Sequence, residues 1–492
     1  MSKPYFAPRE STLVITNWRD SSHPQAGGAE VVCEKLAERF AAEGHDVVLL
    51  AAAVAGAPAT EQRNGYTVIR RGGRFTVYPW ALLWLFLHRG SIEGVIDSQN
   101  GIPFFTPLVV RRQTPVVLLL HHVHQAQWGL YFSPFVATAG RWLERVGCRV
   151  VYGKRAIAAV SPSTRQAARR QLHLRGPIHV VSPGLSSAGP AMPRPRVRAE
   201  HECLVCVGRL VPHKRTELII EAMPALAAEF PDLQLHLVGD GPDRDRLEHL
   251  VTTLGVAQHV RIHGQLAAAD RDRLLRTAWL TVNASAGEGW GLSVLEANAF
   301  GVPALAYRRP GLRDSIIDGE TGWLVDDAEG LAEAISGALT QLKDPAFALA
   351  VGERAERWAA HFSWTDMAHQ MMGILHSEGG RLQQTDERRA STDLATVVHV
   401  PMAMLPAGWT PHFRVDDTWT INAKGLSVLL PGADTQSTAT ALRRAGLPEA
   451  VITNGAVRVV VARPRDRISP LTEIFDALDA TDLAAPDVRT HR

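Results

Sequence analysis

Residues 12–50 contain the apolar run Thr12-Leu-Val-Ile-Thr16, a helical pattern from about Ala29 to Glu43, and a second apolar run, Asp46-Val-Val-Leu-Leu50. A strand, a helix and a strand in this order form a βαβ unit. Because both runs are apolar along their whole length, they suit a parallel sheet that helices cover on both faces. This stretch therefore predicts an α/β protein built on a doubly wound sheet.

The same alternation continues along the chain in two series of strands. A stretch rich in proline and small residues, 186–200, separates the two series and is predicted to be a linker. We therefore expect two Rossmann-like domains, over residues 1–185 and 201–380. The further strands expected in the first domain are Tyr66–Arg70, Gly94–Asp97, Pro115–Leu120, Ala156–Val160 and Ile178–Val181, and those of the second are Cys203–Val207, Leu233–Val238, Val260–His263, Leu280–Ala284 and Pro303–Ala306.

The last third of the chain shows helical patterns and then a change of composition. Helices are expected at Ala328–Leu339, Ala346–His361 and Ser363–Leu375. Residues 381–392 are polar enough to form a second linker. The remaining residues, 393–492, are expected to form a small α/β appendix of unknown function, with strands at Val397–Val400, Leu426–Leu430 and Val457–Val461 and a helix at about Thr438–Ala445.

Composition argues against several classes of protein. The 492 residues include 52 Lys and Arg against 50 Asp and Glu, and a formal net charge of +2 disfavours a protein that mainly binds nucleic acid phosphates. Four cysteines are too few for a disulfide framework. The pair Cys203 and Cys206 lies in an apolar run without a second pair of ligands, so no zinc or redox site is expected.

Two observations bear on the location of the protein. The first ten residues lack the apolar core of a secretory signal, so we expect a cytoplasmic protein. The most apolar stretch, Trp80–Leu87, is too short to span a bilayer. Because Arg70, Arg71, Arg74 and Arg89 flank it, this stretch is either a helix at the membrane surface or a buried helix of an α/β layer. Peripheral contact with the inner membrane face is therefore left open.

Ligands of open parallel sheets bind beyond the carboxyl ends of the strands. The strand expected at Cys203–Val207 runs into Gly208-Arg-Leu-Val-Pro-His-Lys214, which places Arg209 and Lys214 in a short loop before the next helix. Two cations at a helix N-terminus suit a diphosphate. Standing alone, this pair would be interpreted as two solvated surface cations.

A glycine-rich segment follows the strand expected at Leu280–Ala284. It has the sequence Ser285-Ala-Gly-Glu-Gly-Trp-Gly-Leu-Ser-Val-Leu-Glu296, and its three glycines allow close approach of the backbone before a helix. A carboxylate can accept hydrogen bonds from two neighbouring hydroxyl groups, so Glu296 suits a ribose and Glu288 suits a sugar. The alternatives are that Glu288 caps the helix and that Glu296 lies on a solvated helix face.

This segment resembles the Glu-x7-Glu motif of retaining glycosyltransferases of family 4, or glycosyl transferases group 1, which have the GT-B fold. The resemblance covers about residues 12–376. It implies an N-terminal acceptor domain and a C-terminal nucleotide-sugar domain that face a central cleft, with the terminal helices returning to the first domain. The matching segments are Gly27-Gly28, Gly208-Arg209 to Lys214, Gly239-Asp-Gly-Pro242, His263-Gly264, Glu288 to Glu296, Gly301-Val-Pro303 and Gly319-Glu-Thr-Gly322.

The resemblance also implies roles for single residues. Arg209 and Lys214 would hold the donor diphosphate. Glu296 would bind the ribose, Glu288 the donor sugar, and the region around His263 the base. The loop with Gly27 and Gly28 would lie over the donor phosphate or the acceptor, and it lacks the GxGxxG pattern of a nicotinamide enzyme. The full set of predicted donor-binding residues is Gly27, Gly28, Gly208, Arg209, Lys214, Gly239, Asp240, His263, Gly264, Gly287, Glu288, Gly289, Trp290, Gly291, Leu292 and Glu296.

Three histidines follow the strand expected at Pro115–Leu120, in the sequence His121-His-Val-His124. The family places a histidine near the reacting sugar, and we favour His121 or His124 for this role. No cluster of Asp and Glu accompanies the histidines, so neither a metal nor another cofactor is expected. The predicted catalytic residues are His121, His124, Glu288, Arg209 and Lys214.

The implied activity is that of a hexosyltransferase. A sugar would pass from a nucleotide diphosphate sugar to a glycan, lipid-linked or small-molecule acceptor, with retention of configuration. The alternatives are a glycoside hydrolase, a sugar phosphorylase, and a non-catalytic scaffold or sensor that binds sugar nucleotides on the same fold. Nucleic acid is not an expected partner, and the residues do not identify the base, the sugar or the acceptor.

Overall fold

The computed structural model describes residues 11–185, 198–326, 330–383 and, with short gaps, 395–462. The chain divides into two compact units, residues 1–383 and 384–492. Most of the two predicted linkers, 186–200 and 381–392, lies outside the described residues. One part of the second linker is an exception, because Arg381 to Gln383 are helical and belong to the last helix of the first unit.

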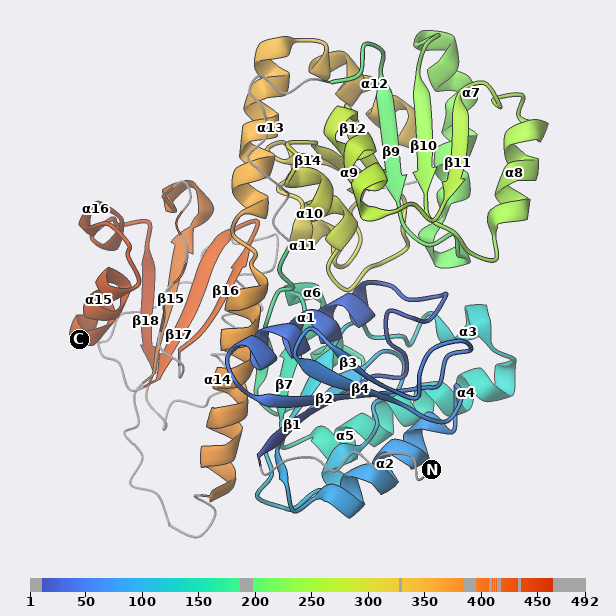
Figure 1. The fold of residues 1–492 in the computed structure, drawn as a ribbon. Helices are drawn as coiled ribbons and strands as arrows, with labels where there is room; N and C mark the ends of the chain where they lie inside the picture. Colours follow the sequence, from blue (N-terminus) through green and yellow to red (C-terminus); the bar gives the residue numbers. More distant parts are fainter. Residues whose placement is uncertain are drawn as a thin grey trace. The chain divides into compact units, whose positions relative to one another are not determined.

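The first unit begins with a sheet that is parallel except at one edge (Figure 1). In the described residues its strands run in the order β3-β4-β2-β1-β5-β6-β7-β8. The edge strand β3 pairs antiparallel with β4 and was not predicted, since its sequence Thr-Glu-Gln-Arg is polar. The strands are β1 (Thr12–Thr16), β2 (Asp46–Ala51), β3 (Thr60–Arg63), β4 (Tyr66–Arg70), β5 (Ile92–Gln99), β6 (Val116–Leu120), β7 (Ala156–Ala159) and β8 (Ile178–Val180).

Helices cover both faces of this sheet. Val14 of β1 packs with α2 and α5, whereas its neighbour Leu13 approaches Leu375 of α14 at Gly94. Successive residues of a strand point to opposite faces, so α2 and α14 cover different sides. The helices of this part are α1 (Gly28–Ala42), α2 (Val77–His88), η1 (Thr106–Leu108), α3 (Trp128–Tyr131), α4 (Pro134–Trp142), the π-helical turn η2 (Leu143–Gly147), α5 (Cys148–Tyr152) and α6 (Pro162–Arg170).

The apolar stretch Trp80–Leu87 lies in α2, and it is buried on one side only. Val77, Ala81, Trp84 and Leu85 are buried in the core, whereas Leu83, Phe86 and Leu87 are exposed. The buried side agrees with a helix of an α/β layer, and contact of the exposed side with a membrane stays a prediction. In the described part of the chain, no helix is long and apolar enough to cross a membrane.

A second, wholly parallel sheet follows in the same unit. Its described strands have the order β11-β10-β9-β12-β13-β14, and they include the five that the sequence predicted. The strands are β9 (Cys203–Val207), β10 (Gln234–Val238), β11 (Val260–Gly264), β12 (Leu280–Asn283), β13 (Ala304–Tyr307) and β14 (Gly322–Val325). The helices are η3 (Pro212–Lys214), α7 (Thr216–Glu229), α8 (Arg244–Thr253), α9 (Ala268–Thr277), α10 (Leu292–Asn298), α11 (Leu312–Ser315), α12 (Leu331–Leu342), α13 (Pro345–Ala359) and α14 (Trp364–Gln383).

Each parallel sheet has one strand at which the direction of winding reverses. β1 lies between β2 and β5, and β9 lies between β10 and β12. Ligands of doubly wound sheets bind at such switch points. The loops that leave β1 and β9 are therefore the places where the fold itself favours a ligand. The long helix α14 returns to the first sheet, where it packs against α1, β6 and β7.

The second unit contains an antiparallel sheet. Its described strands have the order β16-β17-β15-β18. Three of its strands and its main helix were predicted, so this appendix is α/β as expected, whereas β16 and α16 were not predicted. The elements are β15 (Ala395–Pro401), η6 (Met402–Met404), β16 (Thr418–Asn422), β17 (Gly425–Pro431), α15 (Thr435–Arg444), α16 (Glu449–Ile452) and β18 (Arg458–Ala462).

Candidate active site

The loops at the two switch points touch each other. A Cβ atom placed on Gly27, after β1, would lie 3.4 Å from Nε of Arg209, after β9. A Cβ atom on Gly28 would lie 3.1 Å from Cδ1 of Leu292, the first residue of α10. The fold thus brings together three separate segments in which donor-binding residues were predicted.

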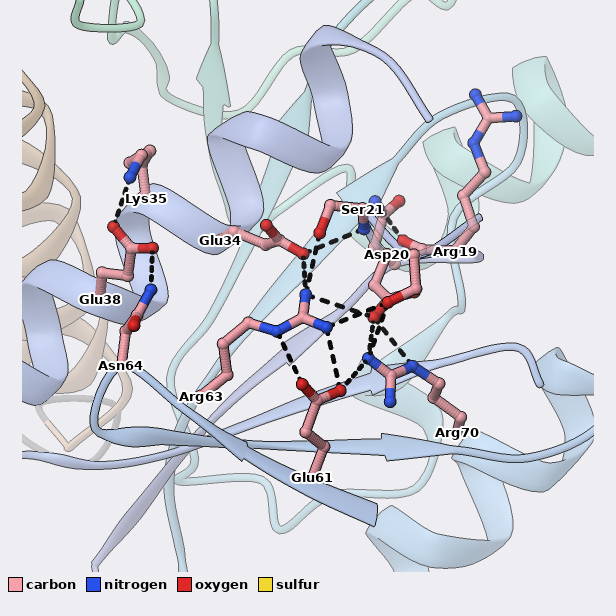
Figure 2. Close-up of polar contacts among 12 residues, drawn as sticks. Arg19, Asp20, Ser21, Glu34, Lys35, Glu38, Glu61, Arg63, Asn64 and Arg70 are labelled. Carbon is pink, nitrogen blue, oxygen red and sulfur yellow. Dashed lines mark hydrogen bonds and ion pairs between the residues drawn. The ribbon is translucent and has the colours of Figure 1, made fainter. Parts of the chain in front are cut away.

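A buried network of charges fixes the loop between β1 and α1 (Figure 2). Asp20 accepts a hydrogen bond from Nε of Arg70 at 2.9 Å, and Nη1 of Arg63 lies 3.7 Å from the same carboxylate. Glu61 of β3 forms ion pairs with both arginines, at 2.9 Å to Arg63 and 2.7 Å to Arg70. Glu34 of α1 binds Arg63 at 3.0 Å. The hairpin of β3 and β4 therefore holds the loop that carries Gly27 in place.

A second ion pair orders the start of α1. Nε of Arg19 lies 2.8 Å from Oε1 of Glu30, and both side chains are buried. Oε2 of Glu30 accepts a hydrogen bond from the backbone N–H of Gly27 at 2.6 Å. Glu30 therefore neutralises Arg19 and caps the helix N-terminus with one carboxylate.

Arg209 is the cation of this site that lacks a carboxylate partner. It is half-buried, and in the described part of the chain no Asp or Glu forms an ion pair with it. Burial and the charge of Arg19 lower the pKa of Arg209, and the charge of Glu30 acts in the opposite direction. A desolvated guanidinium without an anion is suited to bind one, and its planar fork of donors matches a phosphate.

Lys214 and Glu288 form an ion pair across the same site. Nζ of Lys214 donates to Oε1 of Glu288, and Oγ of Ser285 donates to the same oxygen at 2.7 Å. Burial alone would raise the pKa of Glu288, but the charge and hydrogen bond of Lys214 lower it to about 2. The carboxylate is therefore ionised at neutral pH and can accept hydrogen bonds from sugar hydroxyl groups.

The glycine-rich segment lies against the end of β6 in the first sheet. A Cβ atom on Gly289 would lie 2.1 Å from the backbone oxygen of His121, so only glycine fits at this position. Oγ1 of Thr164 donates a hydrogen bond to the backbone oxygen of Gly289 at 3.3 Å. Gly291 has a φ of 90° and is the residue before α10. The start of the loop after β6 is thereby placed next to the segment that carries Glu288.

The three histidines have different surroundings, and the one nearest Glu288 is His122. The Nε2 atom of His121 is hydrogen bonded to Oγ of Ser98 at 2.8 Å and lies 4.0 Å from Sγ of Cys33. Burial lowers the pKa of His121 to about 3. Our preference for His121 as the sugar-facing residue does not fit this geometry, because its ring is hydrogen bonded within the core of the first domain.

His122 has the position that we had expected for His121 or His124. Its Cε1 atom would lie 3.8 Å from a Cβ atom on Gly287. Burial lowers the pKa of His122, and the charge of Glu288 partly opposes this. His122 is therefore close to Glu288 and neutral at pH 7. His124 lies one step further along the loop, with Nδ1 3.8 Å from the buried carboxylate of Glu144.

The remaining predicted residues lie near the carboxyl ends of β10, β11 and β12. The backbone N–H of Gly239 donates to the oxygen of Gly264 at 2.8 Å, which joins two of the predicted loops. His263 stacks on His236, with 2.8 Å between their ring nitrogens. Asp240 lies 3.6 Å from Arg244 and is exposed.

Glu296 and Trp290 differ in what their side chains can contact. Oε1 of Glu296 lies 3.8 Å from Nη1 of Arg271, and burial raises the pKa of Glu296 while Arg271 opposes this. The ring of Trp290 is buried and packs on Phe362, with 5.0 Å between the ring centroids. The Trp290 side chain thus belongs to the core, and only the backbone of this predicted donor residue can reach a ligand.

Within the ranges that the structure describes, no three side chains among His, Cys, Asp and Glu are grouped so that they could hold a metal ion. The expectation that the protein uses no metal remains a prediction.

Two family models match this chain, one in each half of the first unit. The model of glycosyl transferases group 1 matches residues 192–358, and the model of Glycosyltransferase Family 4 matches residues 26–188. This chain belongs to these glycosyltransferases. The matches cover the second sheet and every strand of the first sheet except β1, and they end before the appendix.

Curated relatives support the same assignment. The chain is 27% identical over 394 residues to the GDP-mannose-dependent alpha-(1-6)-phosphatidylinositol monomannoside mannosyltransferase of Mycolicibacterium smegmatis, which covers 74% of this chain and 97% of that protein. It is 33% identical over 215 residues to the D-inositol 3-phosphate glycosyltransferase of Corynebacterium glutamicum, which covers 40% of this chain and 51% of that protein.

Solved structures show the fold. Sucrose-phosphate synthase from Thermosynechococcus elongatus superposes with a TM-score of 0.65 at 22% identity, over 76% of this chain and all of that chain. WaaG, a glycosyltransferase involved in lipopolysaccharide biosynthesis, gives a TM-score of 0.58 at 18% identity, over 74% and 99% of the two chains. The first unit therefore has the GT-B fold, as the sequence predicted.

Proposed function

We propose that this glycosyltransferase transfers a hexose from a nucleotide diphosphate sugar to an acceptor hydroxyl group, with retention of configuration. The observation that carries the proposal is the half-buried guanidinium of Arg209, which forms no ion pair with any Asp or Glu that the structure describes. It lies at the switch point of the second sheet and next to Gly27 at the switch point of the first. This is where the fold favours a ligand, and the charge favours a diphosphate.

The proposed catalysis is electrostatic. As the bond between the sugar and the diphosphate breaks, negative charge accumulates on the leaving diphosphate. Arg209 and Lys214 would stabilise that charge more strongly in the transition state than in the ground state. Glu288 and the neutral ring of His122 would bind sugar hydroxyl groups and orient the anomeric carbon. Lys214 would then serve two anions, the carboxylate of Glu288 and the diphosphate.

Relatives suggest the donor and the acceptor. The Mycolicibacterium smegmatis relative is named for GDP-mannose and a phosphatidylinositol monomannoside, and the Corynebacterium glutamicum relative for D-inositol 3-phosphate. We therefore propose GDP-mannose as the donor and an inositol-containing lipid or phosphate as the acceptor. The sucrose-phosphate synthase and WaaG structures support only the fold and do not bear on this choice.

A lipid acceptor agrees with the exposed side of α2. Leu83 and Leu87 are 56% and 64% exposed, and the guanidinium of Arg89 lies 4.4 Å from the ring centroid of the exposed Phe86. Apolar side chains next to arginines favour the interface of an anionic membrane. We propose peripheral contact of α2 with the inner membrane face. Leu87→Asp should then weaken binding to vesicles that contain phosphatidylinositol, and unchanged binding would contradict this contact.

Catalysis without a metal is part of the same proposal. Many phosphoryl and glycosyl transfers use a divalent cation to neutralise a diphosphate, and Arg209 with Lys214 can supply that charge from fixed side chains. Turnover is therefore expected to continue in EDTA. Loss of turnover in EDTA that magnesium or manganese restores would overturn this part of the proposal.

The function is tested with a panel of donors. The full-length protein is incubated with GDP-mannose, GDP-glucose, UDP-glucose and UDP-N-acetylglucosamine, each with inositol phosphate or phosphatidylinositol vesicles. Release of nucleotide diphosphate and the anomeric configuration of the product are then measured. We expect release with GDP-mannose and an α-configured product. Binding of every donor without turnover would support a scaffold or sensor, and a β-configured product would contradict retention.

A further inference from the structure

The buried carboxylate of Glu144 has an unusual number of hydrogen-bond donors. Its side chain is 0% exposed and lies in the π-helical turn η2 between α4 and α5. Oε1 accepts from the backbone N–H of His124 at 2.6 Å and from Nε2 of Gln99 at 3.5 Å. Oε2 accepts from Nε2 of Gln125 at 2.7 Å and from Nε1 of Trp128 at 3.0 Å. Both oxygens are therefore surrounded by donors.

Three of these donors belong to one segment, the loop of residues 121–128 that leaves β6. The backbone oxygen of His124 also accepts from the N–H groups of Gln127 and Trp128, at 2.8 and 3.2 Å. Nε2 of Gln127 in turn lies 3.2 Å from Nε2 of His122. A continuous chain of contacts therefore leads from Glu144 to the ring that lies beside Glu288.

We propose that Glu144 is a positioning residue that, as a carboxylate, holds the loop after β6 so that the His122 ring stays beside Glu288. The expected effect on kcat rests on the proposed transferase function. The effect of Glu144 on the geometry of the loop can be tested even if that function is wrong. Irregular π-helical turns inside α-helices are frequent at functional sites, which agrees with this placement of Glu144.

The protonation state of Glu144 decides whether all of these hydrogen bonds can form. An ionised carboxylate only accepts, so it matches a shell made of N–H donors. A protonated carboxyl or an amide would turn a donor toward one of these N–H groups and would lose that contact. Burial raises the pKa of Glu144 to about 7, although the surrounding hydrogen bonds oppose the shift. Glu144 therefore changes between its ionised and its protonated form close to neutral pH.

Two titratable groups face Glu144 from neighbouring elements. His124 lies on the loop, and burial lowers its pKa well below the ordinary value. Cys148 lies on α5, and burial raises its pKa well above the ordinary value. Both groups are uncharged around pH 7, so neither changes the charge beside Glu144 in this pH range.

The test compares Glu144→Gln with the wild type. Because glutamine has nearly the same shape but cannot ionise, we expect kcat to fall by about 30-fold at pH 8 while the donor KM changes less than about twofold. We also expect the decrease of wild-type kcat below about pH 7 to be absent from the variant. Glu93→Gln, at an exposed position of β5, is the matched control and should behave as the wild type.

A second variant should shift the pH dependence of kcat instead of removing it. Gln125→Leu removes one donor from the carboxylate and keeps the carboxylate itself. Because the ionised form is then less stabilised, the pKa of Glu144 should rise further. The decrease of kcat on the acid side of the pH profile, its acid limb, should therefore move to higher pH. This shift is measurable even if Glu144→Gln does not fold, and an acid limb that stays in place would overturn the inference.

Histidine NMR separates this inference from the proposed function. In the wild type, the ring signals of His122 and His124 should shift together through about pH 7, and in Glu144→Gln they should not. Signals that titrate identically in both proteins, or a variant with wild-type kcat and pH profile, would overturn the role of Glu144. If the wild type turns over no donor, the proposed function fails, and the NMR comparison still decides the role of Glu144.

Discussion

Lys214 and Glu288 are ion paired across the two loops that follow β9 and β12, and Ser285 donates to the same carboxylate at 2.7 Å. The pair keeps an ammonium and a carboxylate ionised at one place in the site before a donor binds. A site that is already charged does not have to reorganise when charge develops on the leaving group. This relationship motivates the first prediction.

Lys214→Ala should lower kcat by at least about 100-fold, because a cation that faces a leaving diphosphate acts most strongly in the transition state. The substitution also leaves Glu288 without its counter-charge, so the pKa of Glu288 should rise toward and above its ordinary range. Steady-state kinetics with the best donor measures the effect. Lys35→Ala, in a helix surface pair with Glu38, is the matched control. Equal kcat in both variants would show that Lys214 does not act on the diphosphate.

His122→Ala should lower kcat by about 100-fold with little change in the melting temperature, since its ring lies beside Glu288 and Gly287. His121→Ala should instead cost about 1–3 kcal/mol of stability, because it removes the buried hydrogen bond between the His121 ring and Ser98. Thermal unfolding and kinetics of both variants distinguish the two histidines. A stable, inactive His121→Ala together with an active His122→Ala would show that His121 and not His122 faces the sugar.

The long apolar strands of both parallel sheets could be predicted, and the short polar strands could not. A strand buried on both faces is apolar along its length, as β6 is at Val116–Leu120. β3 alternates between exposed and half-buried residues, and its four residues are all polar, so no apolar run marks it. The last helix of the first unit was predicted to end near Leu375, but it continues through Gly379 and Gly380 to Gln383.

The positions of the site residues could be predicted better than the directions of their side chains. Residues after parallel strands meet at one edge of the sheet, which is why Arg209, Lys214 and Glu288 come together. Because β6 is buried on both faces, its pattern does not show whether His121 or His122 faces the second domain. Trp290 was expected in the donor loop, and its contact with Phe362 depends on the return of the chain after α13.

Glu144 was not identified from the sequence at all. The segment from α3 to α5 was given no helix, and a glutamate with arginines nearby in the sequence is usually a solvated side chain. Its buried position depends on the π-helical turn, and its donors come from β5, the loop after β6 and α3. Glu144 is the one carboxylate in residues 134–152, whose other charged residues are arginines, and this is the signal that could have pointed to it.

Glu296→Gln should raise the donor KM by about tenfold and change kcat little. Ribose contacts persist from the bound donor to the transition state, so their loss weakens both states equally. A hydrogen bond to a charged group contributes about 1.5–3 kcal/mol, which corresponds to a factor of roughly ten or more. Initial rates over a range of donor concentrations give both constants. A fall in kcat alone would contradict the assignment of Glu296 to the ribose.

A chain that ends at residue 385 should remain folded and should still turn over donor. All the proposed donor-binding residues lie in the first compact unit, residues 1–383, and the truncation removes most of the second unit. Circular dichroism and donor turnover check this expectation. Aggregation, or a folded but inactive product, would show that the appendix belongs to the catalytic unit.

The most direct measurement of the central claim is nucleotide diphosphate release by the wild type and by Arg209→Ala, together with the donor affinity of both. Arg209 lies at the meeting point of the two switch loops, and among the described residues no carboxylate is ion paired with it. The expected result is steady release from GDP-mannose by the wild type, and a rate at least about 100-fold lower for the variant under saturating donor. Equal rates for both proteins, or no release by the wild type from any nucleotide sugar, would contradict the claim.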